Sequence, residues 1–180
     1  MSLDDGEAHS AIMSARSKVA LIARVHQLLY QSGTHNRVDM KIAIEEIVTD
    51  LVISAGRSDV DLEFSFLGDL MIKISQVSPL VLVLNEIVTN SLKYGLSSKE
   101  PRLSISAVRS SEQITLVISD NGAGICPAAA EEKSGQGSEI VEGLVHQMRG
   151  EIVTQSASTG TKVVLTIPTK PQSSNVKGAN

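Results

Sequence analysis

The sequence predicts an α+β fold, in which helices cover one face of a mixed, mostly antiparallel β-sheet and a helical segment comes first. Two observations predict it. Apolar residues recur at helical spacing in the first part of the chain, whereas short alternating stretches typical of strands dominate the rest. Several neighbouring strands are joined by turns that are too short for the crossovers of a parallel sheet. The pattern therefore disfavours a doubly wound sheet.

The first part of the chain is expected to be helical. Apolar residues follow the helical period from Ala8 to Tyr30, and a further helix is expected from Met40 to Leu51, with Gly56 ending it. We assign residues 1–55 to this helical segment, residues 56–168 to a second domain, and residues 169–180 to a disordered tail because few of them are apolar.

The second domain alternates strands and helices. A helix is expected from Ser78-Pro79 to Gly95. Serine can cap the free N–H groups at its start, and proline suits the first helical position. A shorter helix is expected over residues 140–148, after a loop over residues 120–137. Strands are expected at residues 60–66, 70–74, 103–108, 114–119, 152–155 and 162–167.

Composition narrows the class of protein. The formal net charge of −4 argues against a nucleic-acid partner. Cys126 is the only cysteine, so no intrachain disulfide can form, and we expect a reducing, cytoplasmic location. No apolar run approaches the roughly 20 residues of a membrane-spanning helix. We therefore expect no membrane contact by this chain.

The helix that ends at Gly95 carries the sharpest chemical signal. Glu86, Asn90 and Lys93 are spaced i, i+4 and i+7, which places them on one helical face. The Asn90 amide oxygen suits Mg²⁺, Lys93 can neutralise phosphate, and Glu86 can orient or deprotonate a group beside a γ-phosphate. The alternative is a solvated stripe with an asparagine inside a helix, where asparagine is a poor helix former.

A glycine-bearing loop begins at Asp120. This carboxylate could accept a hydrogen bond from the exocyclic amine of adenine, while Gly122 and Gly124 would let the backbone approach a nucleotide closely. The alternative is an ordinary β-turn, because Asn-Gly is a common hairpin signal. The residue types alone leave both interpretations open.

Further glycines lie near the last two strands. Gly135 and Gly137 precede the predicted helix at residue 140, where free N–H groups would suit phosphate. A dinucleotide-binding fingerprint is excluded, because the third glycine and a preceding βαβ unit are missing. Gly160-Thr161, taken alone, indicates a simple turn.

The order of these motifs is more specific than any one of them. An asparagine-bearing helix, Asp-Asn-Gly-Ala-Gly, Gly-Gln-Gly before a helix and Gly-Thr before the last strand together resemble the GHKL ATPase superfamily. Residues 85–95 are similar to the N box of its histidine kinases. Residues 24–30, Arg-Val-His-Gln-Leu-Leu-Tyr, resemble the end of a HisKA-2-type dimerisation segment. The resemblance runs from about Ser14 to Pro168.

This resemblance implies a Bergerat-type two-layer α/β sandwich that acts as the ATP-binding catalytic domain of a two-component sensor histidine kinase, with ATP and Mg²⁺ as ligands. It makes Asn90 the Mg²⁺ ligand, Glu86 the acidic residue beside the γ-phosphate, and Lys93 a phosphate contact. The remaining nucleotide contacts that it implies are Tyr94, Asp120, Gly122, Gly124, the lid-hinge glycines Gly135 and Gly137, and Thr161 as an indirect contact of adenine.

The resemblance also implies partners. The γ-phosphate would pass to a histidine upstream of this chain and then to a response regulator receiver domain, and the full-length protein would be a homodimer. We assign the phosphoacceptor role to none of the chain's histidines, which are His9, His26, His35 and His146. Two alternatives stay open, namely a degenerate kinase-like phosphotransfer or scaffold protein without ATP turnover, and an anti-sigma-factor serine kinase.

Overall fold

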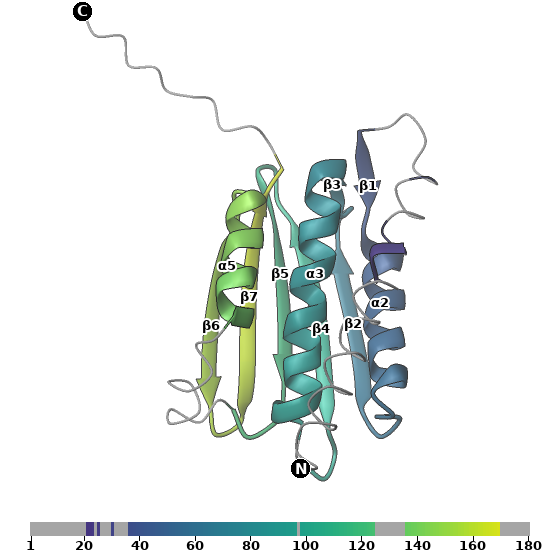
Figure 1. The fold of residues 1–180 in the computed structure, drawn as a ribbon, viewed down its shortest axis with the longest axis vertical. Coiled ribbons are helices and arrows are strands. Elements are labelled where there is room, and N and C mark those ends of the chain that lie inside the picture. Colours follow the sequence, from purple (N-terminus) through teal and green to yellow (C-terminus); the bar gives the residue numbers. More distant parts are fainter. Residues whose placement is uncertain are drawn as a thin grey trace, which may run out of the picture.

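A five-stranded sheet forms the centre of the molecule (Figure 1). The computed structural model describes residues 21–23, 25, 30, 36–96, 98–124 and 136–169. The strands lie in the order β2-β4-β5-β7-β6, with only the β2–β4 pair parallel. Their bounds are β2 Asp61–Leu67, β4 Arg102–Arg109, β5 Gln113–Asp120, β6 Glu151–Ala157 and β7 Gly160–Pro168. The predicted mixed, mostly antiparallel sheet is confirmed.

In the described part of the chain, helices α2 (Lys41–Ser54), α3 (Ile74–Asn90) and α5 (Gln136–Gln147) cover one face of this sheet (Figure 1). Helix α3 lies between the other two and is in contact with both. The helix predicted from Met40 is confirmed and ends where Gly56 adopts a positive φ of 67°. The first predicted helix is described at residues 21–23, 25 and 30, which are helical, and the rest of it lies outside the described residues.

The core between the two layers is aliphatic. Inward-facing strand residues alternate with partly exposed ones, as expected for a sheet with one covered face. The α3 helix opposes them with residues that are almost wholly buried. The most deeply buried members of both layers include Leu80, Val81, Leu84, Val88, Leu103, Ile105, Leu116, Ile118 and Leu165.

The start of α3 differs from the prediction. The helix begins at Ile74, and Pro79 lies inside it rather than at its first position. Gln76 explains the earlier start, because its side-chain oxygen accepts a hydrogen bond from the Lys73 backbone N–H at 3.0 Å. Its amide nitrogen also donates to the Met148 and Pro168 carbonyls at 3.3 and 3.2 Å. These contacts tie the first turn of α3 to α5's end and to β7.

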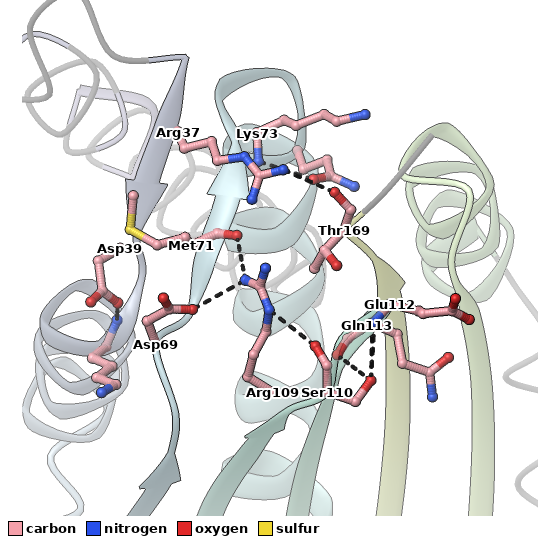
Figure 2. Close-up of polar contacts among 12 residues, drawn as sticks. Arg37, Asp39, Asp69, Met71, Lys73, Arg109, Ser110, Glu112, Gln113 and Thr169 are labelled. Atoms are coloured by element: carbon pink, nitrogen blue, oxygen red, sulfur yellow. Dashed lines mark hydrogen bonds and ion pairs between the residues drawn. The ribbon is translucent and has the colours of Figure 1, made fainter. Parts of the chain in front are cut away.

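A short strand that was not predicted precedes α2. It is β1 (Arg37–Asp39), which pairs antiparallel with β3 (Met71–Lys73) in a separate two-stranded sheet. Figure 2 shows the Arg37 guanidinium donating to the carbonyl of Thr169, at a distance of 3.1 Å. The segment before α2 is therefore fastened to the end of the last strand.

The predicted loop and tail are described only in part. The helix expected at residue 140 begins earlier, at Gln136, so that Gly137 belongs to its first turn, where orphan N–H groups make a glycine tolerable. Residues 125–135 of the loop and residues 170–180 of the tail lie outside the described residues. In the described part of the chain, no helix has the length and apolarity needed to cross a membrane.

Candidate nucleotide-binding site

The helix α3 changes its geometry at its carboxyl end. Residues Ser91–Gly95 form a π-helical turn, η1, in which the Leu96 N–H donates to the Ser91 carbonyl at 2.9 Å. Single π turns inside helices occur frequently at functional sites. The wider turn buries Ser91, Leu92 and Gly95. The same turn leaves Lys93 and Tyr94 exposed.

The predicted metal and phosphate residues share the open side of this helix. Asn90 and Lys93 are exposed and Glu86 is half-buried. The opposite side is buried as expected, with Leu84 and Val88 fully enclosed. The structure thus places the three predicted side chains where solvent or a ligand can reach them.

The carboxylate of Asp120 lies buried at the end of β5. The residue is only 6% exposed, and its oxygens accept three hydrogen bonds from described residues. Ser91 Oγ donates to Oδ2 at 2.8 Å, and the backbone N–H groups of Gly122 and Thr161 each donate to Oδ1 at 3.1 Å. A carboxylate has about four acceptor positions, and donors among the described residues occupy three of them. Hydrogen bonds to a charged group stabilise its burial.

Glycines allow three segments to meet around this carboxylate. A Cβ on Gly122 would overlap the Gly95 carbonyl, and one on Gly160 would overlap the backbone of Asp120. A Cβ on Gly95 would itself lie 3.0 Å from the Asp120 Oδ2 atom. The Ala123 N–H also donates to the Gly95 carbonyl at 3.1 Å. The absence of side chains here brings η1, the end of β5 and the start of β7 together.

Gly124 has a similar role at the next turn. Its φ is +73°, and a Cβ there would overlap the Ala157 carbonyl at the end of β6. Beside it lies a shallow hollow of about 250 Å³, lined by Asp120, Thr161 and neighbouring residues of the β6–β7 hairpin. None of the described residues that line this hollow comes from α3 or η1.

The predicted site residues therefore fall into two groups. Glu86, Asn90, Lys93 and Tyr94 lie along α3 and η1, whereas Asp120, Gly122, Gly124 and Thr161 lie at the ends of the strands. Ser91 joins the groups through its hydrogen bond to Asp120. Thr161 contributes its backbone N–H to this carboxylate. Gly135 lies outside the described residues, and Gly137 lies in α5.

Sequence reasoning missed several residues that build this region. Ser91 and Gly95 lie inside the recognised helix motif, and a polar hydrogen-bond donor next to Asn90 was the available signal for Ser91. Asn121 holds the start of β4 in place. Its Nδ2 donates to the Glu100 carbonyl at 2.8 Å, and its Oδ1 accepts from the Arg102 N–H at 2.8 Å. Arg57 was also missed, because nothing in its local sequence marks it.

The donor set suits magnesium held mainly by its ligand. Among the described residues, no three His, Cys, Asp or Glu side chains converge as a metal site. Mg²⁺ commonly takes one or two protein oxygens and completes its shell with phosphate and water. The exposed amide of Asn90, one helical turn from Glu86, fits such a minimal site.

Two family models match the chain. The model described as histidine kinase-, DNA gyrase B-, and HSP90-like ATPase matches residues 75–171, and the model described as histidine kinase matches residues 1–55. The first match spans more than half of the chain and contains α3, η1 and the strand ends around Asp120. The chain belongs to the family of histidine kinase-, DNA gyrase B- and HSP90-like ATPases.

Curated relatives agree with this family. The sensor histidine kinase PdtaS of Mycobacterium tuberculosis is 28% identical over 173 residues, which cover 91% of this chain and 34% of the relative. Blue-light-activated histidine kinase 1 of Erythrobacter litoralis is 33% identical over 97 residues, which cover 51% of this chain and 26% of the relative. The chain thus spans about a third or less of the length of these relatives.

Solved structures show the same fold. The histidine kinase domain of the Erythrobacter litoralis blue-light activated kinase superposes with a TM-score of 0.75 at 20% identity, over 86% of this chain and 74% of that one. The mycobacterial sensor histidine kinase MprB gives a TM-score of 0.61 at 22% identity, over 76% of this chain and 99% of that one. The two-layer sandwich of a histidine kinase catalytic domain, expected from the motifs, is confirmed.

Proposed function

We propose that this chain is the ATP-binding catalytic part of a sensor histidine kinase, which offers the γ-phosphate of ATP to a histidine outside the chain. The observation that carries the proposal is the buried Asp120 carboxylate, which three donors among the described residues hold in place beside a hollow. We propose that its fourth acceptor position takes the base. Family membership and the naming of its relatives as sensor histidine kinases support it.

Asp120 would recognise the base. Adenine carries an exocyclic amine that donates a hydrogen bond, whereas guanine carries a carbonyl oxygen at the corresponding position. A carboxylate that can only accept would therefore favour adenine over guanine. Gly122, Gly124 and Thr161 would form the backbone wall of this base pocket.

The open side of α3 would face the phosphates. Asn90 would supply an oxygen to Mg²⁺, which neutralises phosphate charge when it is bound. Lys93 and Tyr94 would contact the phosphate and sugar end of the ligand, and Glu86 would orient the attacking imidazole or accept its proton. Gly135 and Gly137 would allow the connecting segment to move over the nucleotide.

Dimerisation and the onward transfer of the phosphoryl group would involve regions outside the nucleotide site. We propose a cytoplasmic protein that dimerises through the helical segment at residues 1–55 and passes the phosphoryl group to a receiver domain. The histidine kinase match over these residues supports this arrangement. Residues 56–168 would then be the ATPase domain.

Two measurements test the proposal. Titration with a fluorescent ATP analogue and Mg²⁺ should show saturable binding that Asn90→Ala and Asp120→Ala each weaken at least about tenfold. Labelled ATP and a separately supplied dimerisation hairpin should then give acid-labile phosphate on that hairpin. Absence of saturable binding would favour a scaffold protein, and acid-stable phosphoserine would favour a serine kinase.

A further inference from the structure

Arg57 reaches from the loop after α2 to the π turn of the nucleotide site. Its Nη1 donates to the Leu92 carbonyl at 3.1 Å, and its Nη2 donates to the Leu96 carbonyl at 3.0 Å. The Leu92 carbonyl lies within the π turn and the Leu96 carbonyl directly follows it, and carbonyls at a helix end lack partners within the helix. One guanidinium thus bonds a carbonyl inside η1 and the carbonyl just after it.

The loop holds Arg57 in a fixed position. Its backbone N–H donates to the Val52 carbonyl of α2 at 3.1 Å, and its own carbonyl accepts from the Val60 N–H at 3.2 Å. The turn before it is made by Gly56, whose φ is +67°. Arg57 therefore links the end of α2 directly to the π turn η1 that follows α3.

Asp59 orients the guanidinium. Its two carboxylate oxygens accept from Arg57 Nε at 2.9 Å and from Nη2 at 3.0 Å. This two-point pairing uses one side of the planar group and leaves the other side for the two carbonyls. The hydrogen bond from Arg57 lowers the pKa of Asp59, because it favours the ionised carboxylate. A lysine could not make all four contacts in one geometry.

We infer that Arg57 is a positioning residue for the nucleotide site, acting through η1. The π turn places Ser91 on the Asp120 carboxylate and brings Gly95 against Asp120 and Gly122. Without the two guanidinium bonds, the carbonyls of Leu92 and Leu96 lose their side-chain partner and the turn is free to rewind. The base pocket and the exposed Lys93 would then shift together. This inference rests on the proposed function.

A matched control lies at the other end of β4. Arg109 also bonds a backbone carbonyl and a carboxylate, with Nη1 at 3.0 Å from the Met71 oxygen and 3.2 Å from Asp69 Oδ1 (Figure 2). Its side chain is 20% exposed, against 25% for Arg57. Leu103 at the near end of β4 pairs with Asp120, whereas Arg109 pairs with Ile114. Arg109 therefore resembles Arg57 in its contacts but lies far from the site.

The test compares nucleotide affinity among these variants of the whole chain, using a fluorescent ATP analogue with Mg²⁺ and competition by ATP or GTP. Arg57→Ala should weaken binding about tenfold and reduce the preference for ATP over GTP. Arg57→Lys should recover part of the loss, and Arg109→Ala should stay within about twofold of the unchanged chain. Folding of each variant is checked by circular dichroism.

Each outcome decides the inference. Binding by Arg57→Ala within about twofold of the unchanged chain, or an equal loss in Arg109→Ala, would overturn it. If Arg57→Ala does not fold, Asp59→Asn is used instead, because it keeps the guanidinium and removes its charged partner. Asp59→Asn should lower nucleotide affinity about threefold, and unchanged affinity would overturn the inference. Failure of the unchanged chain to bind nucleotide would instead refute the proposed function.

Discussion

At the scale of single residues, one carboxylate organises the site. Asp120 is buried and satisfied by donors from three separate segments, namely η1, its own loop and the start of β7. A buried charge is costly unless hydrogen bonds compensate it. These donors compensate the cost of burying the carboxylate and hold it in place.

Ser91 supplies the donor that sequence reasoning overlooked. Replacing it with alanine removes the hydrogen bond to Asp120 Oδ2 and frees that oxygen to rotate. We expect Ser91→Ala to weaken ATP-analogue binding about tenfold at most and to lower the preference for ATP over GTP. Ser104→Ala is the control, because Ser104 Oγ donates to the Ser119 backbone carbonyl and not, among the described residues, to Asp120. Equal effects of both changes would contradict a special role for Ser91.

Gly122 is expected to be intolerant of any side chain. A Cβ at this position would overlap the Gly95 carbonyl, so Gly122→Ala must push η1 away from β5. We expect a loss of about 1–3 kcal/mol in the free energy of unfolding, measured with urea. Gly143→Ala in α5 is the matched control; nothing lies within 4 Å of its Cβ position, and alanine there should gain about 0.5–1 kcal/mol. A neutral Gly122→Ala would disprove the tight junction.

At the scale of elements, local patterns predicted most of the sheet, but the starts of α3 and α5 were misplaced and strand β1 was missed. Strands β2, β4, β5, β6 and β7 were predicted from short alternating stretches, which are typical of a sheet with one covered face. The start of α3 was misplaced because Pro79 resembles a first-turn proline, while the decisive partner, Gln76, acts through distant carbonyls. Strand β1 has only three residues, too few for a period to show.

The positions of the candidate site residues in the fold were predictable in part. The N-box residues and Asp120 follow from motif order, because their chemistry is tied to local sequence. The π turn and the contacts of Arg57 were not predictable, since they depend on long-range contacts between residues that lie 35 and 39 positions apart. Such contacts leave no periodic trace in the chain.

The loop that carries Arg57 gives a prediction on pH. The hydrogen bond from Arg57 lowers the pKa of Asp59 below its ordinary 3.8, so the carboxylate's contribution to stability is complete above that value and is lost as pH falls through the lowered pKa. Urea unfolding should therefore show a constant stability difference between the unchanged chain and Asp59→Asn from about pH 8 to about pH 5, which shrinks below about pH 4. A difference that already disappears between about pH 7 and pH 6 would contradict the assignment.

At the scale of the whole molecule, the region before the sheet is fastened to it at two places. At one end, β1 pairs with β3 and Arg37 bonds the Thr169 carbonyl (Figure 2). At the other, Arg57 joins the end of α2 to the π turn. Since the histidine kinase model covers residues 1–55 and the ATPase model begins at residue 75, these contacts lie at the junction of the two matched regions.

The most direct measurement is calorimetric titration of the chain and of Asp120→Asn with ATP and Mg²⁺. Asparagine keeps the size of the side chain but presents one acceptor oxygen and an amide donor, which would face the donating amine of adenine. The unchanged chain should bind ATP at one site, and Asp120→Asn should bind it at least about tenfold more weakly while remaining folded. Equal binding by the two proteins, or no binding by either, would contradict the account.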